Sequence, residues 1–182
     1  LTAHLSIAFL IFISMFWVGL GLVAERARET ADAALRKVQR IGFWLCLLVG
    51  YMVVTGGFVA GIRAGKAYNT FPLMNGHVVP PEIFMIDPWY LNFFNNMATT
   101  QFNHRLGAWL LAFIVPWLWF RLRALPAVTM RARNVATLLL VALACQISLG
   151  IATLLLAVPV ALGAAHQGGA MLVFGILLWL NH

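Results

Sequence analysis

The chain has 182 residues, of which 63% are hydrophobic and only 9% are charged, and its mean hydropathy is +0.91. A soluble domain carries about 25% charged residues, so these charged side chains are too few to cover a globular surface in water. The net charge of +7 does not indicate nucleic-acid binding, because the basic residues lie between apolar runs and form no basic face on a soluble domain. The composition therefore predicts an integral membrane protein.

Five apolar runs are long enough to cross a bilayer as helices, which takes about 20 residues each. They are residues 1–24, 41–62, 99–121, 134–157 and 160–182. We expect an all-α integral membrane protein whose last four transmembrane helices, within residues 41–182, form an antiparallel four-helix bundle. The chain starts with Leu1 already in an apolar run and ends at His182 without a polar tail, so we also expect a piece of a longer protein.

The segments between the runs predict the orientation in the membrane. Basic residues gather in residues 25–40 and 122–133, and the positive-inside rule assigns these linkers to the cytoplasmic or matrix side. Residues 63–98 combine prolines with many aromatic residues, a pattern typical of an ordered loop at the opposite, outer membrane surface.

Three histidines then lie at similar depth, because the first, third and fifth runs all start from the outer side. His4, His104 and His166 lie within roughly 10 Å of the starts of these runs, at about 1.5 Å per residue. Ionisable side chains inside a membrane are costly and mark functional sites. Two neutral imidazoles from separate helices are what a bis-histidine haem requires. We therefore predict that His104 and His166 bind one haem iron.

Other residues near these histidines suit the same cofactor. Arginine recognises carboxylates well, so Arg105 and Arg63 are predicted to pair with the haem propionates. Gln101 and Gln167 are predicted to orient a ligand or a propionate. Small residues that would admit a flat macrocycle are Gly107, Gly163, Ala164, Gly168 and Gly169.

Simpler interpretations exist for each residue. An intramembrane histidine can hydrogen-bond across helices, and Arg105 can extend to the membrane interface. A zinc site is disfavoured because no third Cys, Asp or Glu ligand lies at this depth. A proton relay would more commonly include a buried carboxylate. His77 lies in the loop and is expected to be a surface residue.

The first and last runs share a pattern. Residues 3–8 with Phe12 align without gaps to residues 165–170 with Phe174, which matches His4 to His166. Internal repeats of this kind are common in membrane proteins. If the two helices are repeat partners, His4 would pair with a histidine preceding Leu1 and would contribute half of a second haem site.

Several segments resemble the haem A synthase family, particularly its alphaproteobacterial and mitochondrial branch. They occur in the family's order and are Phe58–Gly65, Tyr68–Gly76, Gln101–Arg105, Leu149–Thr153 and His166–Gln167. The resemblance implies an eight-helix bundle of two four-helix halves that converts haem O to haem A by oxidising a ring methyl to a formyl group for cytochrome oxidase. This chain would be the C-terminal portion.

The resemblance also implies roles for individual residues. The family's second half holds haem b between two histidines that match His104 and His166, whereas His4 matches an axial ligand of the haem that is oxidised in the first half. Gln101 stands where the first half has a glutamate, which favours an electron-transfer or structural role for this haem. Residues 1–24 would be the last helix of the first half.

The function we expect is thus an oxidoreductase of the haem A synthase type, with the fragment inactive alone. The expected location is a bacterial inner membrane or the mitochondrial inner membrane, with the haem site toward the outer side. Candidate partners are haem O, haem A, the lipid bilayer, haem O synthase, cytochrome oxidase assembly factors and a second copy of the chain, but no nucleic acid. The alternatives are a b-type cytochrome that relays electrons and a non-catalytic haem-binding assembly protein.

Overall fold

A computed structural model describes residues 1–23 and 33–182, and within these ranges the chain contains helices and no strands. The elements are α1 (Thr2–Val23), α2 (Ala33–Gly61), α3 (Ala64–Ala67), η1 (Trp89–Leu91), α4 (Asn92–Asn95), α5 (Met97–Ala124), α6 (Met130–Leu155) and α7 (Val160–Asn181). Among the described residues, α1, α2, α5, α6 and α7 are long and apolar enough to span a bilayer. The prediction of an all-α, multi-pass membrane protein is confirmed.

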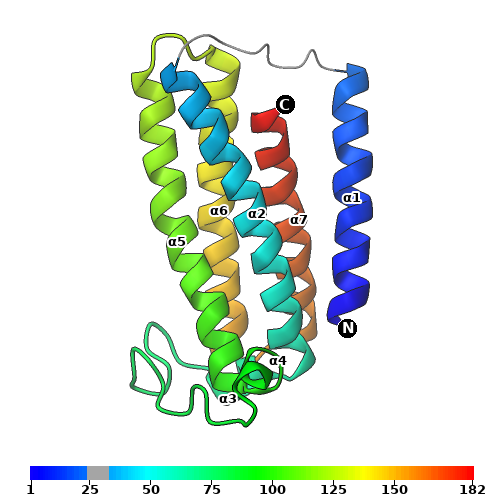
Figure 1. The fold of residues 1–182 in the computed structure, drawn as a ribbon, viewed down its shortest axis with the longest axis vertical. Helices are drawn as coiled ribbons and strands as arrows, with labels where there is room; N and C mark the ends of the chain where they lie inside the picture. The colour runs from blue at the N-terminus through cyan, green and yellow to red at the C-terminus, as the bar shows by residue number, and fades with distance from the viewer. Residues whose placement is uncertain (24–32) are drawn as a thin grey trace.

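Four of the long helices form a closed ring. Helix α2 packs on α5, α5 on α6, α6 on α7, and α7 returns to α2, with successive helices running in opposite directions (Figure 1). Helix α1 lies outside this ring, against α2 and α7. The N-terminus lies at the end of the bundle that carries the connection between α2 and α5, and the C-terminus lies toward the opposite end (Figure 1).

Helix α2 begins eight residues before the predicted start at residue 41. Residues 33–40 read Ala-Ala-Leu-Arg-Lys-Val-Gln-Arg, and most of these residue types favour helix even when exposed. The predicted linker 25–40 therefore ends in helix, and its remainder, residues 25–32, lies outside the described residues. The other long helices begin and end within a few residues of the predicted positions.

Residues 62–96, here called the long loop, connect α2 to α5 and contain α3, η1 and α4. The loop is tied to the beginning of α5 through Asn96, whose side-chain oxygen accepts a hydrogen bond from Thr99 N at 3.1 Å. The amide nitrogen of the same side chain donates to Glu82 O at 2.8 Å. This N-terminal cap fixes where α5 begins, and hence the position of residues one to two turns along it.

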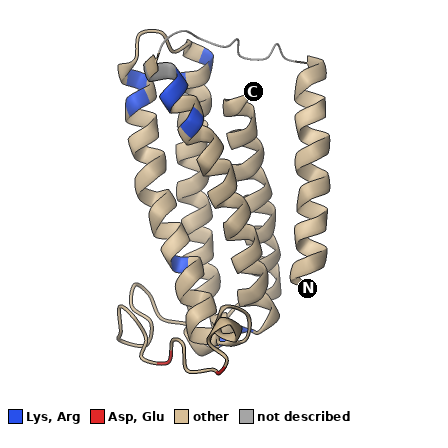
Figure 2. Ribbon diagram, in the orientation of Figure 1, with Lys and Arg blue, Asp and Glu red and all other residues tan. Residues whose placement is uncertain are grey.

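Lysine and arginine gather mainly at the end of the bundle opposite the long loop (Figure 2). The described acidic residues, Glu82 and Asp87, both lie in the loop. This distribution agrees with the predicted topology, while the side of the membrane that each end faces stays a prediction.

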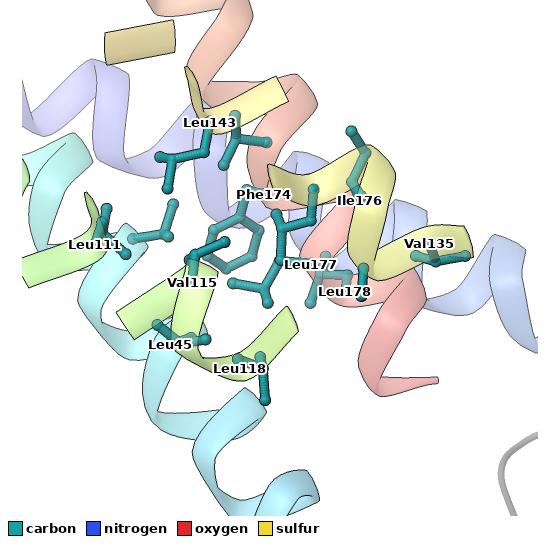
Figure 3. Close-up of a cluster of buried hydrophobic side chains, with 14 of the residues drawn as sticks. Leu45, Leu111, Val115, Leu118, Val135, Leu143, Phe174, Ile176, Leu177 and Leu178 are labelled. Atoms are coloured by element: carbon teal, nitrogen blue, oxygen red, sulfur yellow. The ribbon is translucent and has the colours of Figure 1, made fainter. Parts of the chain in front are cut away.

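Most of the apolar core lies in the half of the bundle away from the long loop, here called the core half. Its buried side chains include Leu45, Leu111, Val115, Leu118, Leu143, Phe174 and Leu177 (Figure 3). On α7, every residue from 173 to 178 is buried, but none from 160 to 172 is. Protein side chains thus close the bundle interior in the core half and cover it incompletely next to the long loop, in what we call the loop half.

Candidate functional site

His104 and His166 lie in the loop half, on helices that are diagonally opposite in the ring. Each is six or seven residues from the start of its helix, which corresponds to about 9–11 Å at 1.5 Å per residue. Both side chains are half-buried. The two residues that the sequence singled out therefore lie at one level of the same bundle.

The imidazole of His104 packs against two neighbouring residues of α2. A Cβ built on Gly56 would lie 3.1 Å from His104 Cε1, so the ring rests on the helix backbone. The hydroxyl oxygen of the buried Thr55 lies 3.0 Å from His104 Nδ1. The same hydroxyl donates to Met52 O at 3.1 Å.

His166 rests on α6 in a comparable way. A Cβ built on Gly150 would lie 2.7 Å from His166 Cε1, closer than a Cβ and a ring atom ordinarily approach. The side-chain amide of Gln146 donates to the backbone oxygen of His166 at 2.8 Å. The ring's own Nδ1 is buried and has no hydrogen-bond partner among the residues described.

The sequence did not identify Thr55, Gly56 or Gly150 as site residues. The glycines it proposed do different things: Gly107 packs against Met52 of α2, and a Cβ on Gly163 or Gly168 would meet nothing within 4 Å. The space beside Gly163 and Gly168 is open, and their role in admitting a flat macrocycle stays a prediction. The useful signal was a glycine at matching depth on the preceding helix, since neighbouring antiparallel helices bring such positions together.

Arg105 and Gln101, one helical turn apart on α5, both bind the long loop. The Arg105 guanidinium donates to Tyr68 O at 3.0 Å and to Thr70 O at 2.7 Å, with longer bonds to Pro72 O and Leu73 O. Gln101 Nε2 donates to the same Tyr68 O at 3.0 Å. Four terminal bonds of Arg105 therefore go to loop carbonyls, and its buried Nε has no partner within the described chain.

Tyr68 also contacts a second part of the long loop through its side chain. Its hydroxyl donates to Glu82 at 3.1 Å. Burial, together with the hydrogen bond to Glu82 and the negative charge of that carboxylate, raises the pKa of Tyr68 above its usual value. The hydroxyl therefore remains a donor at neutral pH, and the carbonyl of the same residue stays in place for Arg105 and Gln101.

The remaining predicted site residues lie at the edge. Arg63 is exposed at the end of α2 in a left-handed conformation, with φ 58°. Gln167 is exposed beside His166, and His4 is exposed on α1, outside the ring of four helices. His77 is exposed in the long loop, where its backbone pairs with Met74.

The arrangement suits a metal held by two imidazoles. In residues 1–23 and 33–182, no group of three or more His, Cys, Asp or Glu side chains is placed to hold a metal ion. Three buried polar atoms nearby also have no partner within these ranges: Thr100 Oγ1, Gln101 Oε1 and Gln146 Oε1. Burying such an atom unpaired costs about 1–3 kcal/mol. Two imidazoles and unpaired polar atoms would suit a large ligand that brings its own donors to a metal.

Comparisons with known proteins show what this chain is similar to. Residues 1–178 match the COX15-CtaA family, described as cytochrome oxidase assembly protein. The heme A synthase of Nitrosospira multiformis is 57% identical over 182 residues, which are 100% of this chain and 51% of that protein. The heme A synthase of Nitrosomonas eutropha is 48% identical over 99% of the chain and 51% of that protein. Heme A synthase COX15 of Arabidopsis thaliana is 40% identical over 100% of the chain and 40% of its own length.

The chain thus spans about half the length, or less, of these curated relatives. No solved structure matches it.

Proposed function

The chain belongs to the COX15-CtaA family of cytochrome oxidase assembly proteins, and from this premise we propose that it is the haem b-holding portion of a haem A synthase. The proposed activity of the whole enzyme is oxidation of the haem O ring methyl to a formyl group, which gives haem A for cytochrome oxidase. The names of relatives that cover the whole chain at 57% and 48% identity support this assignment. We assign this chain the cofactor-holding part of the activity on the basis of its own two histidines, His104 and His166.

One observation carries the proposal. His104 and His166 come from opposite helices of one bundle, lie at one depth, and rest on Gly56 and Gly150 of the neighbouring helices. Because each imidazole contacts the backbone of a neighbouring helix on one side, its position is restricted. We propose that the imidazoles of His104 and His166 would together hold one haem iron, and the haem would supply reversible one-electron chemistry there.

The other residues would act on the edge of the cofactor. We propose that Arg63 and Gln167, both exposed beside the loop half, bind or orient propionates, since charge-assisted hydrogen bonds to carboxylates are strong. Gln101 would offer its unpaired Oε1 to a ligand. Arg105 would support the haem edge mainly through the loop carbonyls that it holds, with its Nε left for a direct contact.

His4 would have a separate role as an axial ligand of the substrate haem. It lies on α1, outside the ring that holds His104 and His166. We propose that its partner ligand belongs to a part of the enzyme other than this ring.

A second candidate, a b-type cytochrome that relays electrons, has one observation in its favour. Among the residues described, the acids Glu82 and Asp87 lie in the long loop, so no carboxylate accompanies the two imidazoles for proton transfer. Within a haem A synthase the same observation supports an electron-relay or structural role for this haem.

The proposed location is a bacterial or mitochondrial inner membrane, with the long loop on the outer side and the basic end toward the cytoplasm or matrix. Haem O synthase, oxidase assembly factors and a second copy of the chain are the proposed partners, because the substrate is too apolar to diffuse through water.

A reduced-minus-oxidised spectrum with pyridine haemochrome analysis of the purified protein tests the proposal. Wild type should show a low-spin haem b spectrum. His104→Ala and His166→Ala should each lose it, and the matched control His77→Ala should keep it. Loss in His77→Ala with retention in His104→Ala would overturn the assignment.

A further inference from the structure

We propose that Thr55 is the positioning residue that sets the protonation pattern of the His104 imidazole, and that the two haem ligands are thereby made electronically unequal. The inference rests on the proposed function. It concerns a residue outside the predicted ligand set and follows from contacts within the bundle.

The hydrogen bonds at Thr55 determine which imidazole nitrogen carries the proton. Its hydroxyl has one hydrogen and donates it to Met52 O, an oxygen that can only accept, at 3.1 Å. With the hydroxyl hydrogen directed to Met52 O, the 3.0 Å contact between Thr55 Oγ1 and His104 Nδ1 is one in which the nitrogen donates. The proton is therefore on Nδ1, and Nε2 carries the lone pair that a metal needs.

Gly56 fixes the same ring laterally. The ring atom nearest to this glycine is Cε1, which lies between the two nitrogens. A ring held at Cε1 by Gly56 and at Nδ1 by Thr55 can neither slide along α2 nor rotate without losing a contact. Two consecutive residues thus position one ligand and choose its tautomer.

The second ligand has the glycine but lacks the hydroxyl. His166 rests on Gly150, and the residue before that glycine is Leu149, whose side chain has no hydrogen-bonding group. His166 Nδ1 accordingly has no hydrogen-bond partner among residues 1–23 and 33–182. The pairs Thr55-Gly56 and Leu149-Gly150 therefore differ at one position. Because of that difference, His104 Nδ1 has a side-chain hydrogen-bond partner and, within the described part of the chain, His166 Nδ1 does not.

This asymmetry has a measurable consequence. A histidine binds a metal through one ring nitrogen. When the N–H on the other ring nitrogen donates to an acceptor, the imidazole is a more basic metal ligand. A more basic ligand stabilises ferric over ferrous iron and lowers the reduction potential. Removing the Thr55 hydroxyl should raise the potential of the bound haem and should weaken the orientation of His104.

The test uses the purified, haem-loaded protein with Thr55→Val, which keeps the shape, and Thr55→Ser, which keeps the hydroxyl. Thr153→Val is the matched control, because Thr153 is also buried in the loop half and its hydroxyl binds only a helix carbonyl, Leu149 O, at 2.7 Å. We expect a more positive midpoint potential and altered low-spin ferric EPR g-values in Thr55→Val. Thr55→Ser and Thr153→Val should match wild type. Equal potentials in Thr55→Val and wild type, or equal shifts in Thr55→Val and Thr55→Ser, would overturn the inference.

A second measurement needs no haem. Nitrogen-15 NMR of haem-free protein labelled at histidine should show His104 protonated at Nδ1, with His104→Ala providing the assignment. Protonation at Nε2 would overturn the inference even if haem binds normally. If wild type bound no haem, the proposed function would fail, whereas this tautomer measurement would still decide the role of Thr55.

Discussion

The core half and the loop half of the same four helices differ in how far protein side chains bury the helix surfaces. In the core half, α7 buries every residue from 173 to 178 among leucine, valine and phenylalanine side chains (Figure 3). In the loop half, α7 buries none of residues 160–172, and imidazoles, glycines and unpaired polar atoms lie among the interior groups. Lipid gives little hydrophobic drive to helix association. The close packing of the core half therefore holds the bundle together and leaves the loop half to specify a ligand.

The largest effect on haem binding is expected from substitutions that change the loop half and leave the core half unchanged. Gly150→Ala should displace the His166 ring, since the added Cβ would come 2.7 Å from Cε1, and most of the low-spin haem spectrum should be lost. Gly56→Ala, at 3.1 Å from His104 Cε1, should have a smaller effect. Helix content by circular dichroism should not change in either variant.

Gly50→Ala is the control for these glycine variants, because a Cβ there would meet nothing within 4 Å. It should leave the spectrum intact. Full haem occupancy in Gly150→Ala would show that the ring does not depend on that backbone contact.

The opposite experiment disturbs the core half. Leu118→Ala removes a side chain that is 1% exposed and should cost about 2–5 kcal/mol of stability. Thermal unfolding in detergent should move to lower temperature, while the haem spectrum at low temperature stays that of wild type. Loss of the spectrum in a folded Leu118→Ala protein would mean that the two halves are not separable.

The attachment of the long loop should give a smaller, local effect. Arg105→Ala removes the hydrogen bonds to Tyr68 O and Thr70 O. Even one bond to a charged group is worth about 1.5–3 kcal/mol, so local opening should become roughly 10- to 150-fold more frequent. Limited proteolysis at the Lys66–His77 segment should therefore accelerate, whereas Arg121→Ala, at the opposite end of α5, should not change it. Equal cleavage rates in both variants would contradict the anchoring role.

The smallest expected effect would sharpen the contrast between the two ligands. Leu149→Thr gives the residue before Gly150 the hydroxyl that Thr55 has. We expect a small negative shift of the haem midpoint potential, opposite in sign to that of Thr55→Val, in a redox titration followed at the α-band. A positive shift would contradict the proposed acceptor role of a hydroxyl at this position.

Much of this architecture can be predicted from the sequence, because membrane-spanning helices are recognised by their length and hydropathy. The five spans and their order were predictable, and so was the common depth of His104 and His166, which follows from counting residues along antiparallel helices. The start of α2 was not, because residues 33–40 are polar and only their helix propensity indicates that the helix continues.

The details of the site required three-dimensional information. Thr55 and Gly56 are 49 and 48 residues from His104 in sequence, and their contact depends on the rotation of α2 about its axis, which hydropathy does not encode. Arg105 was predicted to reach propionates, and nothing in the sequence indicated that its terminal nitrogens bind loop carbonyls. Hydrogen bonds to backbone oxygens leave no residue-type signal, because every residue has that oxygen.

The central claim is that His104 and His166 bind one iron from opposite faces of a single haem. An anomalous difference map collected at the iron edge from crystals of the haem-loaded protein tests it directly. The account predicts one iron peak between the two Nε2 atoms, within bonding distance of both. A peak bound by only one of these imidazoles, or located elsewhere in the bundle, would contradict it.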